Sequence, residues 1–428
     1  MAEVFPSRQA IEQLQLEKLR SLLGVIHPAN RFYSAKVNPI PVLKHLASLS
    51  VYSAEAPFTT KQELSEDQRK HPPYGTDLTF PIGRYTRCHQ TSGTGGGAPL
   101  RWLDTTESWD EMVRAWEEVH RAAGTVSSDR VFFAFSFGPF LGFWLAFEAA
   151  ERLGALCLSG GGLGTVARLS ALLDQEATVL CCTPSYAIRL AEVAAAEKMD
   201  LATRSKVRLI LVAGQAGGST PATRGRIEKL WPGARVFDHH GLTETGPVTF
   251  ECPRKPGVLH VMEHAFYPEI IEPASGRAVA PGESGELVLT TLMRVGSPLL
   301  RYRTGDLVRA ARETVCLCGR SELALVGGIL SRVDDMVVVR GVNVFPTALE
   351  EIVRAWPEIA EYQVRISTVN AMTELLVKVE ADNARPMELA GKLENAFQKA
   401  LSLRVPVEVV PSGSLPRFEM KAKRWVRE

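Results

Sequence analysis

The sequence predicts an α/β fold with a large N-terminal domain, a β-subdomain within it, and a small C-terminal α+β domain. Short apolar strands alternate with helices from about residue 107 to 240, which is typical of mostly parallel sheets with right-handed crossovers. Residues 257–309 change to β runs separated by turns. A tail of strands and helices follows, and its length of about 95 residues fits a separate domain.

Size and charge exclude several classes of protein. The 428 residues suffice for about two or three domains. A net charge of +1 gives no basic surface, so we expect no nucleic-acid partner. The longest apolar run, residues 131–150, is interrupted by Ser136, Gly138 and Pro139, so we expect no membrane span. The beginning of the chain has no apolar signal core, and its seven cysteines are an odd number, which together predict a cytoplasmic protein.

The N-terminal part is predicted to be helical before a glycine-rich loop. Residues 11–23 have apolar side chains at helical spacing, and Thr60 with Glu63 indicates a helix start. Residues 91–100 combine hydroxyl side chains with three consecutive glycines, so the backbone of this loop can approach a phosphate closely. The Gly-Lys-Ser/Thr ending of a P-loop is absent. A flexible surface turn fits these residues equally well.

The α/β part is predicted from strands that end in glycine, serine or threonine. Helices are expected at residues 107–123 (with Thr106 as N-cap), 142–153, 165–173 and 187–197, and strands at 130–135, 155–158, 178–182 and 207–212. Residues 238–246 follow another short strand. There the hydroxyl of Thr243 and the carboxylate of Glu244 are groups that can hold a phosphate and its Mg²⁺. On these nine residues alone, an ordinary turn with a solvated glutamate is the simpler interpretation.

The second half of the chain is predicted as a β-subdomain and a tail. Strands are expected at residues 285–291 and 299–302. The tail is expected to contain helix 347–355, strands near 362–366 and 375–379, and helix 387–402. We therefore divide the chain into residues 1–333, with the β-subdomain at about 250–320, and residues 334–428.

Five stretches in this order resemble the adenylate-forming ligases, in particular the phenylacetate–CoA ligase branch. They are residues 91–99, 238–246, 302–307, 331–345 and 415–424. The N-terminal helix and residues 60–64 extend the resemblance to nearly the whole chain. The resemblance implies an aryl acid–CoA ligase: a carboxylate attacks the α-phosphate of ATP, pyrophosphate leaves, and the thiol of coenzyme A displaces AMP.

The resemblance also assigns roles to residues. It implies that the β- and γ-phosphates are held by Thr91, Ser92, Gly93 and Thr94. Thr243 would contact the α-phosphate, Glu244 would ligate Mg²⁺, Asp306 would bind the ribose hydroxyls, and Arg332 would pair with the ribose or phosphate. Adenine would be bordered by Ala213, Gly214, Gln215, Ala216, Gly217, Asp238, His239 and His240.

The C-terminal residues are assigned by the same resemblance. Lys421 would bridge the attacking carboxylate and the α-phosphate, with Lys423 as the nearby competitor. The C-terminal domain would rotate about a hinge at Asp334 between the two half-reactions, and Gly341 would then lie near the pantetheine tunnel. The chain departs from the family pattern at three places: Ala98 replaces a lysine, residues 418–420 read Phe-Glu-Met, and Ser331 replaces a glycine.

A zinc site is predicted from cysteines on both sides of the β-subdomain. Two thiolates on a turn, with a cysteine and a histidine from another turn, form a Cys₃His set suited to structural Zn²⁺; they are Cys252, His260, Cys316 and Cys318. His264 is an alternative fourth ligand. Some members of the resembled branch have a similar zinc, whereas three unrelated cysteines in a reduced protein are the alternative.

An aromatic acid is the expected substrate. Flat apolar walls and glycines that leave room for a ring are supplied by Phe137, Phe140, Phe143, Pro184, Gly214, Gly241 and Gly246. Each phenylalanine is also compatible with a core position. The expected acids are phenylacetate, benzoate or anthranilate. His239 and His240 favour a substituted benzoate such as anthranilate, because a histidine can hydrogen-bond a ring amino or hydroxyl group. The alternatives are a ligase that loads a carrier protein and an inactive zinc-containing binding protein. A homodimer is compatible with the sequence.

Overall fold

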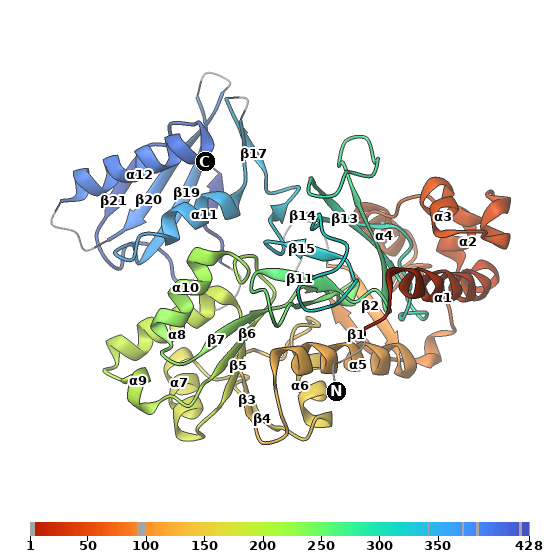
Figure 1. The fold of residues 1–428 in the computed structure, drawn as a ribbon, viewed down its shortest axis with the longest axis horizontal. Coiled ribbons are helices and arrows are strands. Elements are labelled where there is room, and N and C mark those ends of the chain that lie inside the picture. The colour runs from red at the N-terminus through yellow and green to blue at the C-terminus, as the bar shows by residue number, and fades with distance from the viewer. Residues whose placement is uncertain are drawn as a thin grey trace.

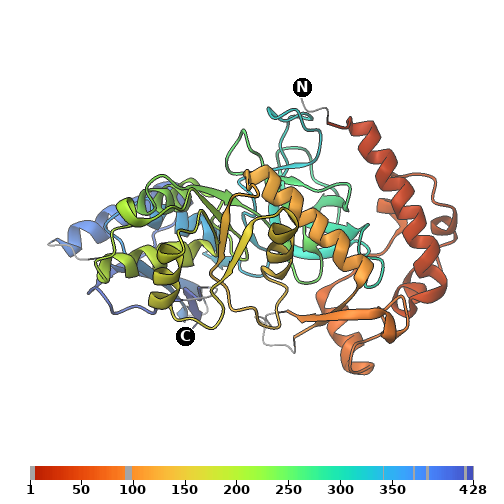
Figure 2. The ribbon, with the colours of Figure 1, turned by 90° about the horizontal axis from the view of Figure 1, so that it is seen from below.

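A computed structural model describes residues 5–91, 99–340, 342–369, 372–381, 385–418 and 422–427. It confirms the predicted fold class: N-terminal helices, a parallel α/β sheet, antiparallel sheets and a C-terminal α+β domain (Figure 1). Seen from below, helix α1 lies at one end of the molecule and the C-terminal domain at the other (Figure 2). Within the described ranges, no helix is both long and apolar enough to cross a bilayer.

The N-terminal helices pack against one another around the apolar face of α1. They are α1 (Arg8–Ala29), α2 (Arg31–Val37), the 3₁₀ helix η1 (Pro41–His45), α3 (Leu49–Glu55), α4 (Lys61–Lys70) and the 3₁₀ helix η2 (Ile82–Arg84). Leu19 and Ile26 of α1 are completely buried in this cluster. The helix start predicted at Thr60 is confirmed, and there Thr60 and Glu63 form a reciprocal capping box.

A hairpin that the sequence did not reveal carries the glycine-rich loop. Strand β1 (Tyr85–Gln90) pairs antiparallel with β2 (Arg101–Thr105), and the loop connects them. Helix α5 (Thr106–Ala123) follows directly. The prediction of Thr106 as N-cap was wrong by one residue, because Thr105 has the extended backbone and its side chain accepts a hydrogen bond from the Ser108 N–H.

The central parallel sheet has the strand order β4-β3-β5-β6-β7. Its strands are β3 (Arg130–Phe133), β4 (Leu156–Ser159), β5 (Val179–Cys182), β6 (Leu209–Val212) and β7 (Arg235–Asp238). Apolar cores lie on both faces: α5 and α6 (Trp144–Arg152) pack on one, and α7 (Thr165–Asp174), α8 (Pro184–Ala196) and α10 (Pro221–Leu230) on the other. The short helix α9 (Leu201–Arg204) precedes β6. All carboxyl ends of these strands therefore meet at one edge.

Three antiparallel sheets follow the central sheet. A small hairpin joins β8 (Gly241–Leu242) to β9 (Gly246–Pro247). The next sheet has the order β10 (Thr249–Glu251), β11 (Val258–Val261), β15 (Ala324–Val326), and the third β12 (Phe266–Ile271), β13 (Ser284–Thr291), β14 (Tyr302–Arg309), β16 (Ser331–Arg332). The predicted strand over residues 299–302 was wrong except for its last residue, because Arg301 has φ of 43°, which a β-strand does not accommodate.

The C-terminal part has an apolar core of its own. A hairpin of β17 (Val337–Val339) and β18 (Val342–Val344) leads to α11 (Pro346–Arg354). The sheet has the order β21 (Val407–Val410), β20 (Met372–Glu380), β19 (Glu361–Val369), β22 (Trp425–Arg427), and α12 (Pro386–Leu401) packs on it. Both predicted helices and both predicted strands are confirmed, with longer strands. Strands β21 and β22, which pair in parallel with their neighbours, were not predicted.

Candidate active site

The candidate site lies at the carboxyl edge of the central sheet, in the loops after β5, β6 and β7. Pro184 opens α8 directly after β5. Ser185 donates a hydrogen bond of 2.7 Å from its hydroxyl to Gln215 Oε1 and thereby joins two of these loops. Gly214 has φ of 80° and open space around it, so this loop turns without a side chain at its tip.

Residues 243–245 form the turn between β8 and β9, and the carboxylate of Glu244 is buried in it. The ammonium group of Lys61 lies 3.2 Å from Glu244 Oε1. The hydroxyl of Tyr302 donates to the same oxygen over 3.2 Å. Burial, followed by the charge of Glu244, raises the pKa of Tyr302 well above its ordinary value, so this hydroxyl remains a donor. Thr243 is half-buried beside this carboxylate.

The two glycines of this hairpin lie so close to neighbouring atoms that a side chain does not fit at either position. A Cβ on Gly246, whose φ is 82°, would lie 2.6 Å from Met112 Sδ. A Cβ on Gly241 would lie 2.7 Å from the carbonyl oxygen of Gly246. A side chain at either position would therefore displace the Thr243–Glu244 turn.

Asp306 lies in the neighbouring sheet, and its buried carboxylate has Arg332 and His240 beside it. Arg332 Nη1 donates to Oδ1 over 2.9 Å, and His240 Nε2 lies 3.2 Å from Oδ2. Burial opposes ionisation of Asp306, but the neighbouring His240 and Arg332 outweigh burial and hold the pKa of this carboxyl below its ordinary value. Because Arg332 also donates to the carbonyl of Thr304 over 2.9 Å, the group is fixed before any ligand arrives.

Asp238 and His239 are buried directly after β7. Asp238 accepts a hydrogen bond from the hydroxyl of Ser219 over 2.5 Å, and burial raises the pKa of this carboxyl to about 6. His239 Nδ1 lies 2.6 Å from the carbonyl of Thr249, and its ring centre lies 4.2 Å from that of Trp116. Burial lowers the pKa of His239 to about 3, so its ring is neutral at physiological pH.

The predicted aromatic wall lies between β3 and α6. The ring of Phe137 lies 4.9 Å from that of Trp144, and the ring of Phe143 lies 5.5 Å from that of Phe135. Phe143 is buried, whereas Phe137 and Phe140 are half-buried. These rings therefore pack mainly on one another, with Phe137 and Phe140 retaining exposed surface.

The base of the glycine-rich loop is closed by hydrogen bonds. Thr91 accepts a bond of 3.0 Å from the Leu100 N–H on its hydroxyl, and its own N–H donates to the Leu100 carbonyl over 2.9 Å. The Gln90 N–H donates to the carbonyl of Pro139 over 2.7 Å, so the loop begins beside the aromatic wall. Five predicted site residues lie outside the described residues: Ser92, Gly93, Thr94, Gly341 and Lys421.

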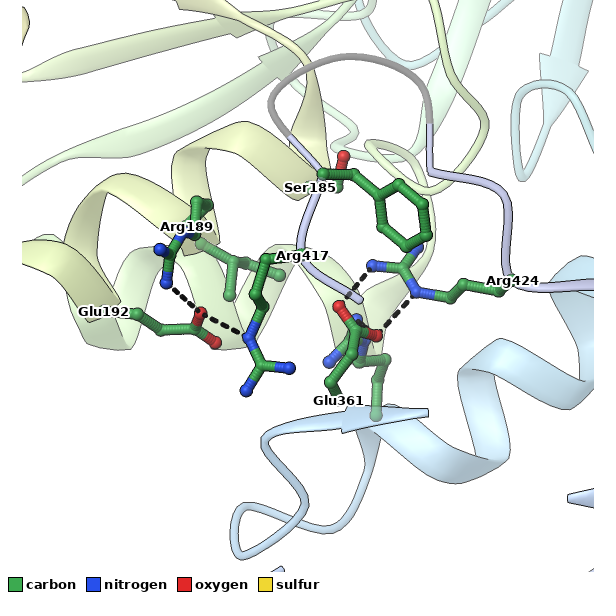
Figure 3. Close-up of a pocket in the computed structure, with 9 residues that line it drawn as sticks. Ser185, Arg189, Glu192, Glu361, Arg417 and Arg424 are labelled. Carbon is green, nitrogen blue, oxygen red and sulfur yellow. Dashed lines mark hydrogen bonds and ion pairs between the residues drawn. The ribbon is translucent and has the colours of Figure 1, made fainter. Parts of the chain in front are cut away.

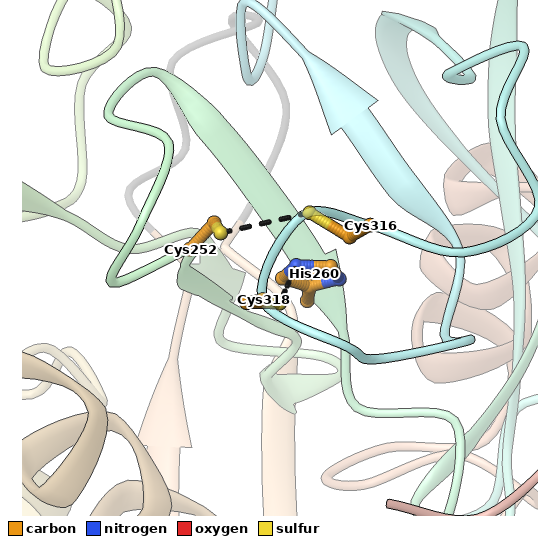
Figure 4. Close-up of side chains that lie close together, drawn as sticks. All are labelled: Cys252, His260, Cys316 and Cys318. Atoms are coloured by element: carbon orange, nitrogen blue, oxygen red, sulfur yellow. Dashed lines mark hydrogen bonds between the residues drawn. The ribbon is translucent and has the colours of Figure 1, made fainter.

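The four predicted zinc ligands are brought together from three turns or strands (Figure 4). Their ligand atoms all lie within 4.8 Å of one another. Cys252 Sγ and Cys316 Sγ are 3.7 Å apart, and Cys318 Sγ lies 3.4 Å from His260 Nε2. Tetrahedral zinc with Zn–S of about 2.3 Å and Zn–N of about 2.0 Å requires separations of about 3.8 and 3.5 Å, so the set fits this ion. The alternative ligand His264 is not part of this cluster, and its Nε2 lies 3.7 Å from Glu118.

The beginning of the chain is anchored beside this cluster. The guanidinium group of Arg8 donates to both oxygens of Glu263 over 2.6 and 2.9 Å. Glu263 in turn accepts from the Leu323 N–H over 2.6 Å. The ring of Phe5 lies 4.3 Å from the guanidinium carbon of Arg320, which follows the cysteine turn. The N-terminal helix therefore braces the region that carries Cys316 and Cys318.

The C-terminal domain contacts α8 and α10 through charged groups. Arg226 of α10 donates to the carbonyls of Ile359 and Ala360 over 2.5 and 3.3 Å. Glu192 of α8 lies 3.7 Å from Arg417 and 3.9 Å from Arg226. Figure 3 shows Glu192 between arginines, with Glu361 and Arg424 paired nearby. These contacts fix one orientation of the C-terminal domain over the sheet.

Sequence reasoning missed three residues of this site. Lys61 and Tyr302 contact Glu244, and Arg294 Nη1 donates to the carbonyl of Thr243 over 2.7 Å. Lys61 stands in a helix start and Tyr302 at the start of a strand, where charged and aromatic residues are ordinary. No local pattern marks Arg294.

Family comparisons agree with this geometry. Residues 105–293 match the model of the AMP-binding enzymes, and residues 341–428 match that of the AMP-binding enzyme C-terminal domain. The chain is 32% identical to a phenylacetate-coenzyme A ligase of Escherichia coli over 97% of this chain and 94% of that protein. It is also 32% identical to that of Aromatoleum evansii, over 98% and 95%. The chain belongs to the phenylacetate–CoA ligase family. This family assignment makes it an AMP-forming acid–CoA ligase.

Solved structures support the family assignment and the domain arrangement. A 2-hydroxyisobutyryl-CoA ligase in its postadenylation state is 27% identical and has a TM-score of 0.92, covering 100% of this chain and 91% of that chain. The same relative in its thioesterification state is 28% identical and has a TM-score of 0.74, over the same shares of the two chains. The arrangement of this phenylacetate–CoA ligase family member therefore resembles the postadenylation state more closely. An anthranilate CoA ligase, AuaEII, is 18% identical over 79% and 66% of the chains, with a TM-score of 0.60, and shares the fold.

Proposed function

We propose that this ligase activates an aromatic carboxylate as its acyl-AMP and transfers the acyl group to coenzyme A. The observation that carries the proposal is the meeting of two groups beside the carboxyl edge of the central sheet. These are the Thr243–Glu244 turn and the carboxylate of Asp306, linked by His240. Phosphate and ribose are the parts of ATP that a hydroxyl, a metal-bound carboxylate and a second carboxylate recognise.

Glu244 is the proposed ligand of Mg²⁺. Its carboxylate is buried and its contacts are with Lys61 and Tyr302, a set of one cation and one hydroxyl that a divalent cation can replace at the same oxygens. The bound ion neutralises charge on the phosphates. Thr243 contacts the α-phosphate, and Thr91, Ser92, Gly93 and Thr94 hold the β- and γ-phosphates in the proposal.

The nucleoside part of ATP is proposed to lie over β6 and β7. Asp306 accepts hydrogen bonds from the ribose hydroxyls, and Arg332 positions its carboxylate. Adenine is bordered by Ala213, Gly214, Gln215, Ala216, Asp238, His239 and His240. The 3.2 Å contact with Asp306 supports the nucleotide side for His240, and His239 Nδ1 lies against the carbonyl of Thr249, so neither contact favours anthranilate over other aryl acids.

The acid is proposed to lie against the partly exposed rings of the β3–α6 segment. Its walls are Phe137, Phe140, Pro184, Gly214, Gly241 and Gly246. Half-buried rings supply flat apolar surface, and Gly214 leaves open space. An aryl acid of the phenylacetate or benzoate type is therefore the proposed substrate class.

Lys421 is the proposed catalytic cation. It lies on the C-terminal domain, for which we propose residues 334–428, and residues 1–333 form the N-terminal domain. Between the two half-reactions, rotation about Asp334 moves Lys421 away from the site and brings Gly341 to it. The two arrangements of the 27–28% identical relative support this proposal.

A structural Zn²⁺ is proposed in the Cys₃His set. The fit of the two measured separations to tetrahedral geometry supports it. All four positions are protein ligands, so the ion stabilises the fold and leaves no open coordination site for chemistry.

The decisive experiment measures pyrophosphate release with ATP, Mg²⁺ and a panel of aryl acids, with and without coenzyme A. The proposal expects release with one or more acids and a thioester only when coenzyme A is present. Adenylate formation without a thioester would identify a carrier protein as the acyl acceptor. The absence of turnover with every acid would overturn the substrate class.

A further inference from the structure

A fully buried ion pair lies directly behind the Thr243–Glu244 turn. The side chains of Asp104 and Arg294 are both 0% exposed. Arg294 Nε and Nη2 donate to the two oxygens of Asp104, each over 2.6 Å. The remaining arm, Nη1, donates to the carbonyl oxygen of Thr243 over 2.7 Å. The planar guanidinium group thus holds a carboxylate and a backbone carbonyl in one fixed geometry.

The pair connects two segments that the proposed reaction needs to align. Asp104 belongs to β2, which closes the hairpin carrying the glycine-rich loop. Arg294 follows β13, and the nearby Ser297 hydroxyl donates to the carbonyl of Leu103 over 2.6 Å. A single guanidinium group therefore ties strand β2 of the hairpin that carries the glycine-rich loop to the turn that bears Glu244.

The bond to Thr243 acts on the orientation of Glu244. The carbonyl of Thr243 and the N–H of Glu244 belong to the same planar peptide unit, so fixing the oxygen fixes that plane. Stability alone does not account for a buried ion pair, because well-packed apolar residues in its place are often equally stable. The presence of two buried charges is explained if Arg294 Nη1, which donates to the Thr243 carbonyl, positions the turn.

We propose that Asp104 and Arg294 are positioning residues that clamp the Thr243–Glu244 turn against the β1–β2 hairpin. The proposal rests on the proposed function, because it assumes that these two segments hold the phosphates and Mg²⁺. Displacement of a reacting group by about 1 Å can reduce a rate by about 100-fold.

The test replaces the pair by apolar residues and compares it with a matched pair elsewhere. The variant is Asp104→Leu/Arg294→Met. The control is Glu269→Leu/Arg301→Met, since Arg301 forks onto Glu269 over 2.9 and 2.9 Å and donates its third arm to the carbonyl of Ala56 over 2.6 Å. Both arginines donate two hydrogen bonds to a carboxylate. The third donor binds the carbonyl of Thr243 in one pair and that of Ala56 in the other. Arg294→Lys keeps the charge and provides a milder variant if the double variant does not fold.

The readouts are the affinity for ATP with and without Mg²⁺, measured by calorimetry on the full chain, and the rate of pyrophosphate release. In the clamp variants, the increase in ATP affinity that Mg²⁺ produces is expected to be about tenfold smaller than in the wild type. The rate of pyrophosphate release is expected to be about 100-fold lower. The control is expected to keep both values, even with an equal loss of Tm. Retention of both values by the folded clamp variants would overturn the clamp, as would equal losses in the control.

The failure of the proposed function gives a different result. In that case the wild-type chain releases no pyrophosphate with any acid. The increase in ATP affinity produced by Mg²⁺ would still be smaller in the clamp variants than in the wild type and the control. A wild-type chain whose ATP affinity does not change with Mg²⁺ would overturn both proposals.

Discussion

Replacing Arg226 by alanine is expected to loosen the C-terminal domain from the arrangement found here. The Arg226 side chain is 14% exposed, and its guanidinium group makes one short and one long hydrogen bond to the Ile359 and Ala360 carbonyls. Burial, followed by the charge of Arg354, lowers the pKa of Arg226 to about 10, so the group remains charged at neutral pH. A hydrogen bond from a charged group contributes about 1.5–3 kcal/mol. We count only the loss of the short bond to Ile359, because a water molecule can replace the long bond to Ala360 after the substitution.

The resulting loss of about 2 kcal/mol corresponds to a roughly 30-fold shift between the two domain arrangements. Energy transfer between dyes on the two domains measures this equilibrium directly. Because the present arrangement resembles a postadenylation state, pyrophosphate release should fall by at most about 30-fold. Thioester formation from a supplied acyl-AMP should not fall.

Arg235→Ala is the control for this prediction. Arg235 also donates to a backbone carbonyl, that of Ala123, but both residues lie in the N-terminal part of the chain. Its loss should leave the domain equilibrium unchanged. An equal fall of both half-reactions in Arg226→Ala, or an unchanged energy transfer, would refute the interpretation of Arg226 as a contact that stabilises this arrangement.

Four further outcomes are expected. Lys421→Ala should slow adenylation by about 100- to 1,000-fold while thioester formation from supplied acyl-AMP remains, and equal loss of both would contradict its role. Asp306→Asn should weaken ATP binding by about tenfold or more, measured by calorimetry, because a charged acceptor is lost. Burial, followed by the charge of Asp67, raises the pKa of Asp77 to about 7. Asp77 therefore lowers the free energy of unfolding, fully above pH 7 and progressively less as the pH falls towards about 4. Asp77→Asn should therefore raise Tm at pH 8 and leave it unchanged at pH 4, and an equal change at both would count against this assignment. Freshly purified protein should contain about one zinc per chain by metal analysis, and Cys318→Ser should lower both the zinc content and Tm.

The sequence predicted the elements whose local pattern agrees with their final surroundings. The alternation of apolar strands and helices predicted the central sheet, and Thr60 with Glu63 predicted the start of α4. The β1–β2 hairpin was missed because its strands carry residues such as Arg87 and His89, and β1 is only partly buried. A strand with this composition resembles a loop until its partner is known.

The candidate site was predictable in its ordered motifs and not in its contacts. The positions of Thr243, Glu244 and Asp306 follow from the resemblance, and the structure brings them to one edge. Their supports come from far along the chain: Arg294 reaches Asp104 across 190 positions. Such pairs depend on how β2 and the end of β13 meet, which no local pattern encodes. The two adjacent histidines illustrate the same limit, since one packs on Trp116 and the other reaches Asp306.

The anchoring of the N-terminal helix has a consequence for synthesis on the ribosome. Arg8 and its partner Glu263 are 255 positions apart in the chain. At about 5–20 residues per second, roughly 13–50 s separate the appearance of the helix from that of its anchor. Throughout this interval the apolar face of α1 lacks its final partners, including Leu292 and Leu300. This helix is thus made long before its anchor, and chaperones would have access to its apolar face during the whole interval.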